Sequence, residues 1–126
     1  MRASRRRATS THHCIVVPSL RRPGARWLLP GWLAITVGPV IVSWRPLDAA
    51  ELAHELEHVG QWRRHGLRFI PRYLGAARSA VRRGGDRYLD NPFEVAARRA
   101  ADRSKVASAR AVPAVPADRR ATTTAL

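Results

Sequence analysis

The stretch that decides the fold is residues 48–66, which read DAAELAHELEHVGQWRRHG. Asp48 followed three residues later by Glu51 is typical of a capping box at a helix start, and Pro46 blocks an earlier start. Apolar residues then recur at helical spacing at Leu52, Leu56, Val59 and Trp62. Gly66 can adopt the left-handed backbone conformation that commonly ends a helix. The sequence therefore predicts a helix from about Asp48 to His65, with its leucines facing a core and its histidines at the margin of that core.

The pattern His-Glu-x-x-His lies inside this predicted helix, at residues 54–58. His54 and His58 would leave the same helical face about 6 Å apart, so their rings can converge on one zinc ion. Glu55 projects beside them, where a carboxylate can take a proton from a metal-bound water as a general base. The pattern therefore predicts zinc-dependent hydrolysis. Selection for a charged helix surface is the alternative interpretation.

A catalytic zinc site of this kind needs a third protein ligand and keeps one position open for water. The three-histidine variant is rejected, because Gln61 and Arg64 stand where its glycine and third histidine would be. His65 lies on nearly the same helical face and stays open as a ligand. Its favoured role is a helix-end cation that interacts with the terminal carbonyls.

The favoured third ligand is Glu94, within DNPFEVAA at residues 90–97. Asn91 as cap and Pro92 as first helical residue open a new helix and place Glu94 in its first turn. A glutamate three residues after an asparagine cap can also close a capping box without any metal. The residues alone leave both interpretations open.

The run from Gly38 to Ala97, about half the chain, resembles small bacterial zinc metallopeptidases of gluzincin type. In that family the metal helix continues as His-Val-x-Gln-aromatic, and a downstream Tyr-x-x-Asn-Pro-x-Glu-x-x-Ala segment supplies the third ligand. The downstream segment is matched here by Tyr88, Asn91, Pro92, Glu94 and Ala97. The resemblance implies His54, His58 and Glu94 as zinc ligands and Glu55 as the base.

The chain departs from the family pattern just after Glu94. Gluzincins often carry an acidic residue there that holds a ligand histidine, whereas Ala96-Ala97-Arg98-Arg99 is neutral and then basic. The sequence therefore offers no partner for the ring of either histidine, which puts catalytic strength in doubt more than metal binding.

Two tyrosines near these motifs are candidate transition-state stabilisers. The hydroxyls of Tyr73 and Tyr88 could steady an oxyanion opposite the zinc. The alternative is that each ring simply packs with its hydroxyl at the surface. Tyr73 lies in a helix expected from Arg72 to about Arg83 after Pro71, and the last helix is expected from Pro92 to about Arg110.

Residues 27–44 contain no charged side chain and are long enough for a membrane segment. Pro30-Gly31 and Gly38-Pro39 divide them into pieces of about six residues, which suit strands. The sequence therefore predicts a β-hairpin from residues 33–37 and 40–43, and a strand beside the metal helix could hold an extended substrate by backbone pairing. A membrane segment stays the alternative. The run does not read as a secretion signal, so a bacterial cytoplasmic location is expected.

The composition is strongly basic. The 126 residues have a net charge of +14, and all but one of the 23 basic residues are arginine, the exception being Lys105. The arginines are spread along the chain without interleaved aromatics or a helix-turn-helix or zinc-finger pattern, so no sequence-specific nucleic-acid binding is expected. Nonspecific contact with polyanions through the arginines is expected instead. The single cysteine, Cys14, excludes an intramolecular disulfide.

Together these patterns predict a small α+β domain of residues 27–110, with a short β-hairpin before the metal helix and two further helices. Residues 1–26 are expected to be a disordered basic segment and residues 111–126 a disordered tail. The expected function is that of a zinc metallopeptidase acting on a peptide or protein. Two alternatives are kept: a catalytically inactive, metal-stabilised module that binds peptides or polyanions, and a protein tethered to a membrane through residues 27–44.

Overall fold

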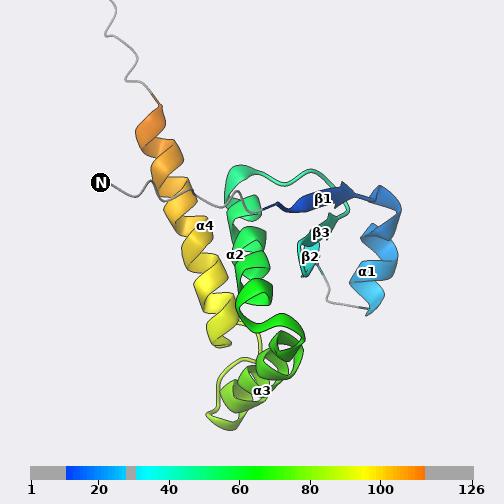
Figure 1. Cartoon of the computed structure of the whole chain (residues 1–126), viewed down its shortest axis with the longest axis vertical. Coiled ribbons are helices and arrows are strands. Elements are labelled where there is room, and N and C mark those ends of the chain that lie inside the picture. The colour runs from blue at the N-terminus through cyan, green and yellow to red at the C-terminus, as the bar shows by residue number, and fades with distance from the viewer. Residues whose placement is uncertain (1–10, 28–30, 113–126) are drawn as a thin grey trace, which may run out of the picture.

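A computed structural model describes residues 11–27 and 31–112 of the chain, and Figure 1 shows their arrangement. The fold is α+β, as the sequence predicts, with helices beside one small sheet. The strands are β1 (His13–Val16), β2 (Ala34–Val37) and β3 (Val40–Ser43). The helices are α1 (Arg21–Trp27), α2 (Ala49–His65), α3 (Phe69–Arg82) and α4 (Pro92–Ala111), with short 3-10 turns η1 (Pro18–Leu20) and η2 (Gly66–Arg68).

The predicted hairpin is confirmed as strands β2 and β3. They pair antiparallel, with Val37 opposite Val40, and Gly38 takes a φ of 58° in the turn, which glycine adopts without steric cost. The strand order is β1-β3-β2, so β2 is an edge strand. Its other side faces the helices rather than another strand.

The expectation of a disordered segment through residue 26 is wrong for residues 13–26. Strand β1 pairs parallel with β3, with His13 opposite Val40, and α1 follows it. The Trp32 ring packs so closely against Gly24 that a Cβ there would lie 1.9 Å from a ring atom, and the Trp32 indole donates to Arg21 O. The pairing of β1 depends on β3, the second strand of the hairpin, so local sequence could not predict it. The folded unit therefore begins well before residue 27, while residues 1–10 and 113–126 of the predicted disordered ends lie outside the described residues.

Helix α2 begins and ends at the predicted residues. The Asp48 carboxylate accepts from Glu51 N at 2.7 Å while the Glu51 carboxylate accepts from Asp48 N at 2.9 Å, which makes a complete capping box. Arg45 adds an ion pair to Glu51 at 2.7 Å. The last turn is closed by Gly66, whose φ is 56°. Strong local signals at both ends thus fix which residues α2 presents to its neighbours.

Helix α2 lies between α4 on one side and strand β2 on the other, with α3 at the end of the pair (Figure 1). Val59 on α2 and Ala97 on α4 are buried in this region, and Ile41 is buried in the sheet. A small alanine at the contact lets two helices approach closely. The α2–α4 contact is what brings residues 54–58 and residue 94 together.

Helices α3 and α4 differ little from their predicted bounds. Helix α4 begins at Pro92 as expected, with Asn91 as cap, and extends to Ala111. Helix α3 begins at Phe69, earlier than the predicted Arg72, because the 3-10 turn Gly66–Arg68 leads directly into it and Pro71 is tolerated in a first turn. Among the described residues, no helix combines the length and the apolar character that crossing a bilayer requires.

Candidate metal centre

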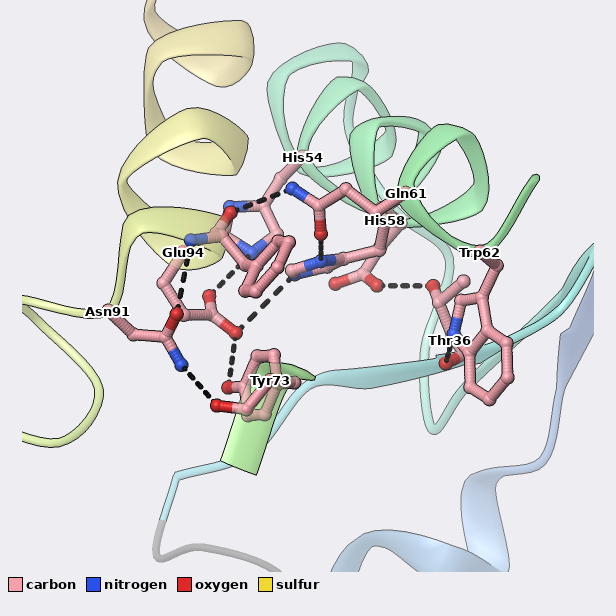
Figure 2. Close-up of polar contacts among 10 residues, drawn as sticks. Thr36, His54, His58, Gln61, Trp62, Tyr73, Asn91 and Glu94 are labelled. Carbon is pink, nitrogen blue, oxygen red and sulfur yellow. Dashed lines mark hydrogen bonds and ion pairs between the residues drawn. The ribbon is translucent and has the colours of Figure 1, made fainter. Parts of the chain in front are cut away.

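Three side chains converge at the α2–α4 contact: His54 and His58 from α2 and Glu94 from α4 (Figure 2). The His54 Nε2 atom lies 3.5 Å from Glu94 Oε2, and the His58 Nε2 atom lies 3.5 Å from Glu94 Oε1. The two imidazole centroids are 5.0 Å apart. One candidate ligand atom from each residue lies within 4.8 Å of the other two. The structure therefore brings together all three residues that the sequence proposes as metal ligands.

The spacing of these atoms fits a bound zinc ion. Ligand atoms about 2.1 Å from a tetrahedral zinc lie roughly 3.4 Å apart. Each histidine Nε2 lies 3.5 Å from a different oxygen of Glu94, so both carboxylate oxygens face the point that the three side chains share. The same separations are longer than an ordinary N–H···O hydrogen bond. Glu94 Oε2 is also buried without a hydrogen-bond partner among the described residues, which a cation between the three side chains would supply.

Gln61 determines which nitrogen of His58 faces this point. The Gln61 amide Nε2 donates to Phe93 O at 3.0 Å, so its Oε1 must be the acceptor toward His58 Nδ1 at 2.9 Å. His58 Nδ1 therefore carries a proton, and Nε2 is the nitrogen that faces Glu94. With Nδ1 held as a donor, Nε2 is the nitrogen that a neutral ring would offer to a metal ion. Gln61 is thus the ring partner that the sequence did not reveal.

Tyr73 holds the Glu94 carboxylate from the other side. Its hydroxyl donates to Glu94 Oε1 at 2.6 Å. Burial alone would raise the pKa of Glu94, but His54, His58 and Tyr73 outweigh it and hold that pKa well below its usual range. Burial and the neighbouring Glu94 together raise the pKa of Tyr73, which keeps its hydroxyl protonated as a donor. In this arrangement Tyr73 orients a candidate ligand, and its predicted role at an oxyanion stays a prediction.

The start of α4 explains why Glu94 is free to face the histidines. Asn91 Oδ1 accepts from Phe93 N at 3.1 Å and so caps the helix, while Asn91 N donates to Tyr88 O at 3.2 Å. A capping box would instead have joined Asn91 N to the Glu94 carboxylate. The capping-box alternative for Glu94 is therefore not what the structure contains.

Glu55 lies beside the two histidines and is held by strand β2. The Thr36 hydroxyl donates to Glu55 Oε2 at 2.6 Å. A hydrogen bond to one oxygen of a carboxylate fixes the plane of the group and leaves the other oxygen to act on a neighbouring molecule. Both Glu55 and Thr36 line the same cleft as His54 and His58. The sequence predicted Glu55 as the base but gave no sign of Thr36.

The free edge of β2 is partly covered by Trp62. Leu33 O accepts from Trp44 N, so the alternation of an antiparallel pair directs the backbone groups of Ala34 and Thr36 to the free edge. The Trp62 indole donates to Thr36 O at 3.0 Å (Figure 2). An added strand could therefore use the backbone of Ala34 and the N–H of Thr36, but not Thr36 O.

Tyr88 enters the cleft from the loop before α4. Asp86 Oδ1 accepts from Tyr88 N and from Leu89 N, both at 2.7 Å, which folds this loop into a tight turn. Burial, followed by the charge of Glu94, raises the pKa of Tyr88 to about 12. Tyr88 thus remains a neutral hydroxyl beside the candidate metal centre, as a stabiliser of an oxyanion would need to be.

His65 is placed away from the three converging side chains. Its ring stacks on Phe69 with centroids 6.5 Å apart and meets Phe93 edge-on at 5.8 Å. It is not among the described groups whose ligand atoms converge. The open alternative of His65 as a ligand is therefore not supported by its position.

The centre opens into a cleft of about 1000 Å³ between β2, α2, α3 and the loop before α4. Five carboxylates line it: Asp48, Glu51, Glu55, Asp86 and Glu94. Lys105 is the single lysine among the described residues that line it, and none of them is arginine. In a chain of net charge +14 this is a marked separation of charge, although Arg45 reaches one of these carboxylates, Glu51, in an ion pair.

Comparison of the chain with models of known protein families, with curated proteins and with solved structures finds no match.

Two residues of this centre were missed by reasoning from sequence. Gln61 had a detectable signal, since it lies three residues after His58 on the same helical face and such pairs interact. Thr36 had none, because its contact with Glu55 depends on how the hairpin packs against α2.

Proposed function

We propose that the chain is a zinc-dependent metallopeptidase-like hydrolase. The observation that carries the proposal is the convergence of His54, His58 and Glu94 on one point, with the Glu55 carboxylate beside them in an open cleft. Zinc bound by three protein ligands activates a water near neutral pH and polarises a carbonyl oxygen. Gln61 and Tyr73 support the proposal because each orients a candidate ligand.

In the proposed mechanism Glu55 is the general base. The Thr36 hydroxyl holds its Oε2, and Oε1 accepts the proton of the attacking water. Glu55 then passes that proton to the leaving amine. Tyr88, neutral and among the residues that line the cleft, would donate a hydrogen bond to the oxygen that becomes negative.

The cleft supports an extended, apolar, neutral-to-basic peptide as substrate. Its walls carry large apolar side chains beside the carboxylates, including Trp32, Ile35, Trp62 and Leu74. A peptide can pair with the open backbone groups of Ala34 on the edge strand. Five carboxylates and a single amine repel an acidic peptide. We therefore expect Asp and Glu to be rare near the cleaved bonds. Nonspecific contact with polyanions is assigned to the surface that carries the arginines. The proposed location of the protein is the cytoplasm.

The decisive experiment compares Glu55→Gln with Glu57→Gln. Glu57 lies on the same helix, paired with Arg64 at 2.9 Å, and does not line the cleft. Purified variants are assayed for bound zinc and for cleavage of a casein-derived peptide mixture followed by mass spectrometry. We expect both to keep zinc, with Glu55→Gln losing about a hundredfold or more in rate and Glu57→Gln losing none.

Two results would overturn the proposal. If the wild-type protein holds no stoichiometric zinc, the three converging side chains do not form a zinc site. If zinc is bound but Glu55→Gln cleaves as fast as the wild type, the base is misassigned. Zinc binding without any cleavage would favour the alternative of a metal-stabilised peptide-binding module.

A further inference from the structure

Helix α3 carries a stripe of exposed apolar side chains. Leu67 just before the helix and Ile70, Leu74 and Val81 within it follow the spacing of one helical face. Their exposed fractions are 83%, 48%, 55% and 54%. The neighbouring face of α3 is the one that packs, through Phe69, Ala77 and Ala80. The stripe therefore contributes little to the core of the chain.

Arginines without acidic partners surround this stripe, with Arg78 and Arg82 on the part of the helix next to it. Residues 66–85 contain five arginines and no Asp or Glu. All five are exposed: Arg68, Arg72, Arg78, Arg82 and Arg83. None of them is in an ion pair with a carboxylate of the described residues. A helix with an exposed apolar stripe beside unpaired arginines is typical of a segment that lies in the headgroup region of a bilayer.

We propose that the exposed face of α3, defined by Leu67, Ile70, Leu74 and Val81 with the flanking arginines, docks on an anionic membrane surface. The apolar side chains enter the boundary between headgroups and acyl chains, and the arginine stems extend so that each guanidinium reaches a lipid phosphate. Helix α3 lies at one end of the molecule, away from the sheet, so a flat surface can approach it (Figure 1).

Two other occupants fit this face less well. A second copy of the chain related by two-fold symmetry would bring the same five arginines against one another, and like charges repel. A nucleic acid would use the arginines but would leave the leucine, isoleucine and valine side chains without apolar partners. Only a lipid surface satisfies the charge and the apolar stripe together.

The proposal does not depend on hydrolysis, although the two features are adjacent. Ile70 and Leu74 belong both to the stripe and to the lining of the cleft. Docking would therefore place the opening of the cleft beside the lipid surface. Because vesicle binding is measured without any substrate, failure of the proposed enzyme activity would leave this proposal untouched.

The experiment is co-sedimentation of the full-length protein with phosphatidylcholine vesicles that contain or lack phosphatidylglycerol. The apolar test variant is Leu67→Gln with Val81→Gln, two stripe residues outside the cleft lining. Its matched control is Val106→Gln with Val112→Gln, which are exposed near the end of α4. The charge test variant is Arg68→Gln with Arg78→Gln and Arg82→Gln. Its control is Arg99→Gln with Arg103→Gln and Arg110→Gln on α4, where these arginines are exposed.

We expect binding to the anionic vesicles only. The apolar variant should weaken it at least about tenfold, and the charge variant on the order of a hundredfold. Each α4 control should stay within about twofold of the wild type, because it changes no group on the α3 face. Circular dichroism checks that every variant is folded.

Three outcomes would overturn the proposal. Absence of binding to the anionic vesicles removes it directly. Equal losses in the α3 and α4 arginine variants would mean that net charge alone attracts the protein to the vesicles. Loss of binding with the α3 arginine variant but not with the apolar variant, together with equally tight binding to double-stranded DNA, would mean a polyanion site instead of a membrane-docking face.

Discussion

The α2–α4 contact and the outer face of α3 differ in which side chains they bury and which they expose. Between α2 and α4 the chain buries polar groups, with Gln61 only 1% exposed, Asn91 0% and Glu94 4%. Along α3 it exposes large apolar side chains, of which Leu67 is the most accessible. Folding stability alone favours neither arrangement, because buried polar groups cost free energy unless they are satisfied and exposed apolar groups gain nothing. The difference supports two separate proposals, a metal ion between α2 and α4 and a membrane surface at α3.

Glu94→Gln should have the largest effect, on the proposed zinc site between α2 and α4. It keeps the side-chain volume and removes the charge, so zinc affinity should fall by more than about a hundredfold, beyond the loss of an outer partner. Zinc at a hundredfold excess over its dissociation constant stabilises the wild type by about 2.7 kcal/mol, and this gain should vanish. Thermal unfolding with zinc and with a chelator measures it. An undiminished zinc-dependent shift in the variant would show that Glu94 is no ligand.

Gln61→Leu should have the next largest effect. It leaves Phe93 O and His58 Nδ1 without their hydrogen bonds, so we expect a stability loss of about 1–3 kcal/mol. Zinc affinity should fall about 10- to 100-fold, as for other outer partners of a metal ligand. Urea unfolding and zinc titration provide the two values. Arg64→Leu on the exposed side of α2 is the control, and equal behaviour of the two variants would contradict the role assigned to Gln61.

Thr36→Val tests whether strand β2 positions the base. Valine has the shape of threonine without the hydroxyl, so Glu55 loses its donor while β2 keeps its β-branched residue. A hydrogen bond to a charged group contributes about 1.5 kcal/mol or more, which corresponds to at least about a tenfold fall in kcat. KM and zinc content should not change, and Thr36→Ser should restore the rate. A serine variant as slow as the valine variant would point to strand packing instead.

The smallest effect is expected for stability when the exposed apolar stripe of α3 is changed. Leu67→Gln with Val81→Gln replaces two apolar side chains that have little contact with the core, so stability should change by no more than about 0.5 kcal/mol per site. Urea unfolding under the conditions used for Gln61→Leu makes the values comparable. A loss as large as that of Gln61→Leu would mean that the stripe belongs to the folded core.

The parts of the fold that the sequence predicted are those with strong local signals. Helix α2 was predicted to within a residue because its capping box, apolar spacing and terminal glycine all lie inside it. The hairpin followed from Gly38-Pro39 between two β-prone runs. Strand β1 was missed because its partner, β3, lies some 27 residues away and the pairing leaves no local trace.

The residues of the candidate site also separate into those that local sequence predicts and those that depend on how the elements pack. His54, Glu55 and His58 are fixed relative to one another by one helix, so their spacing alone placed them together. Glu94 required the packing of α4 against α2, and from the residues alone it was as well explained as a cap. Thr36 lies in a strand and contacts α2 only in the folded chain. The residues alone therefore placed His54, Glu55 and His58 together within one helix, although they did not reveal Gln61 in that helix, and they left the contacts between elements open.

The indole of Trp62 has a consequence beyond the substrate. An unpaired strand edge is a template on which other chains can add, and this is how many β-rich proteins aggregate. Because Trp62 occupies the Thr36 carbonyl, a foreign strand finds partners only at Ala34 and at the N–H of Thr36, and its pairing with β2 ends there. The edge thus stays accessible to a short peptide while resisting the growth of a fibril.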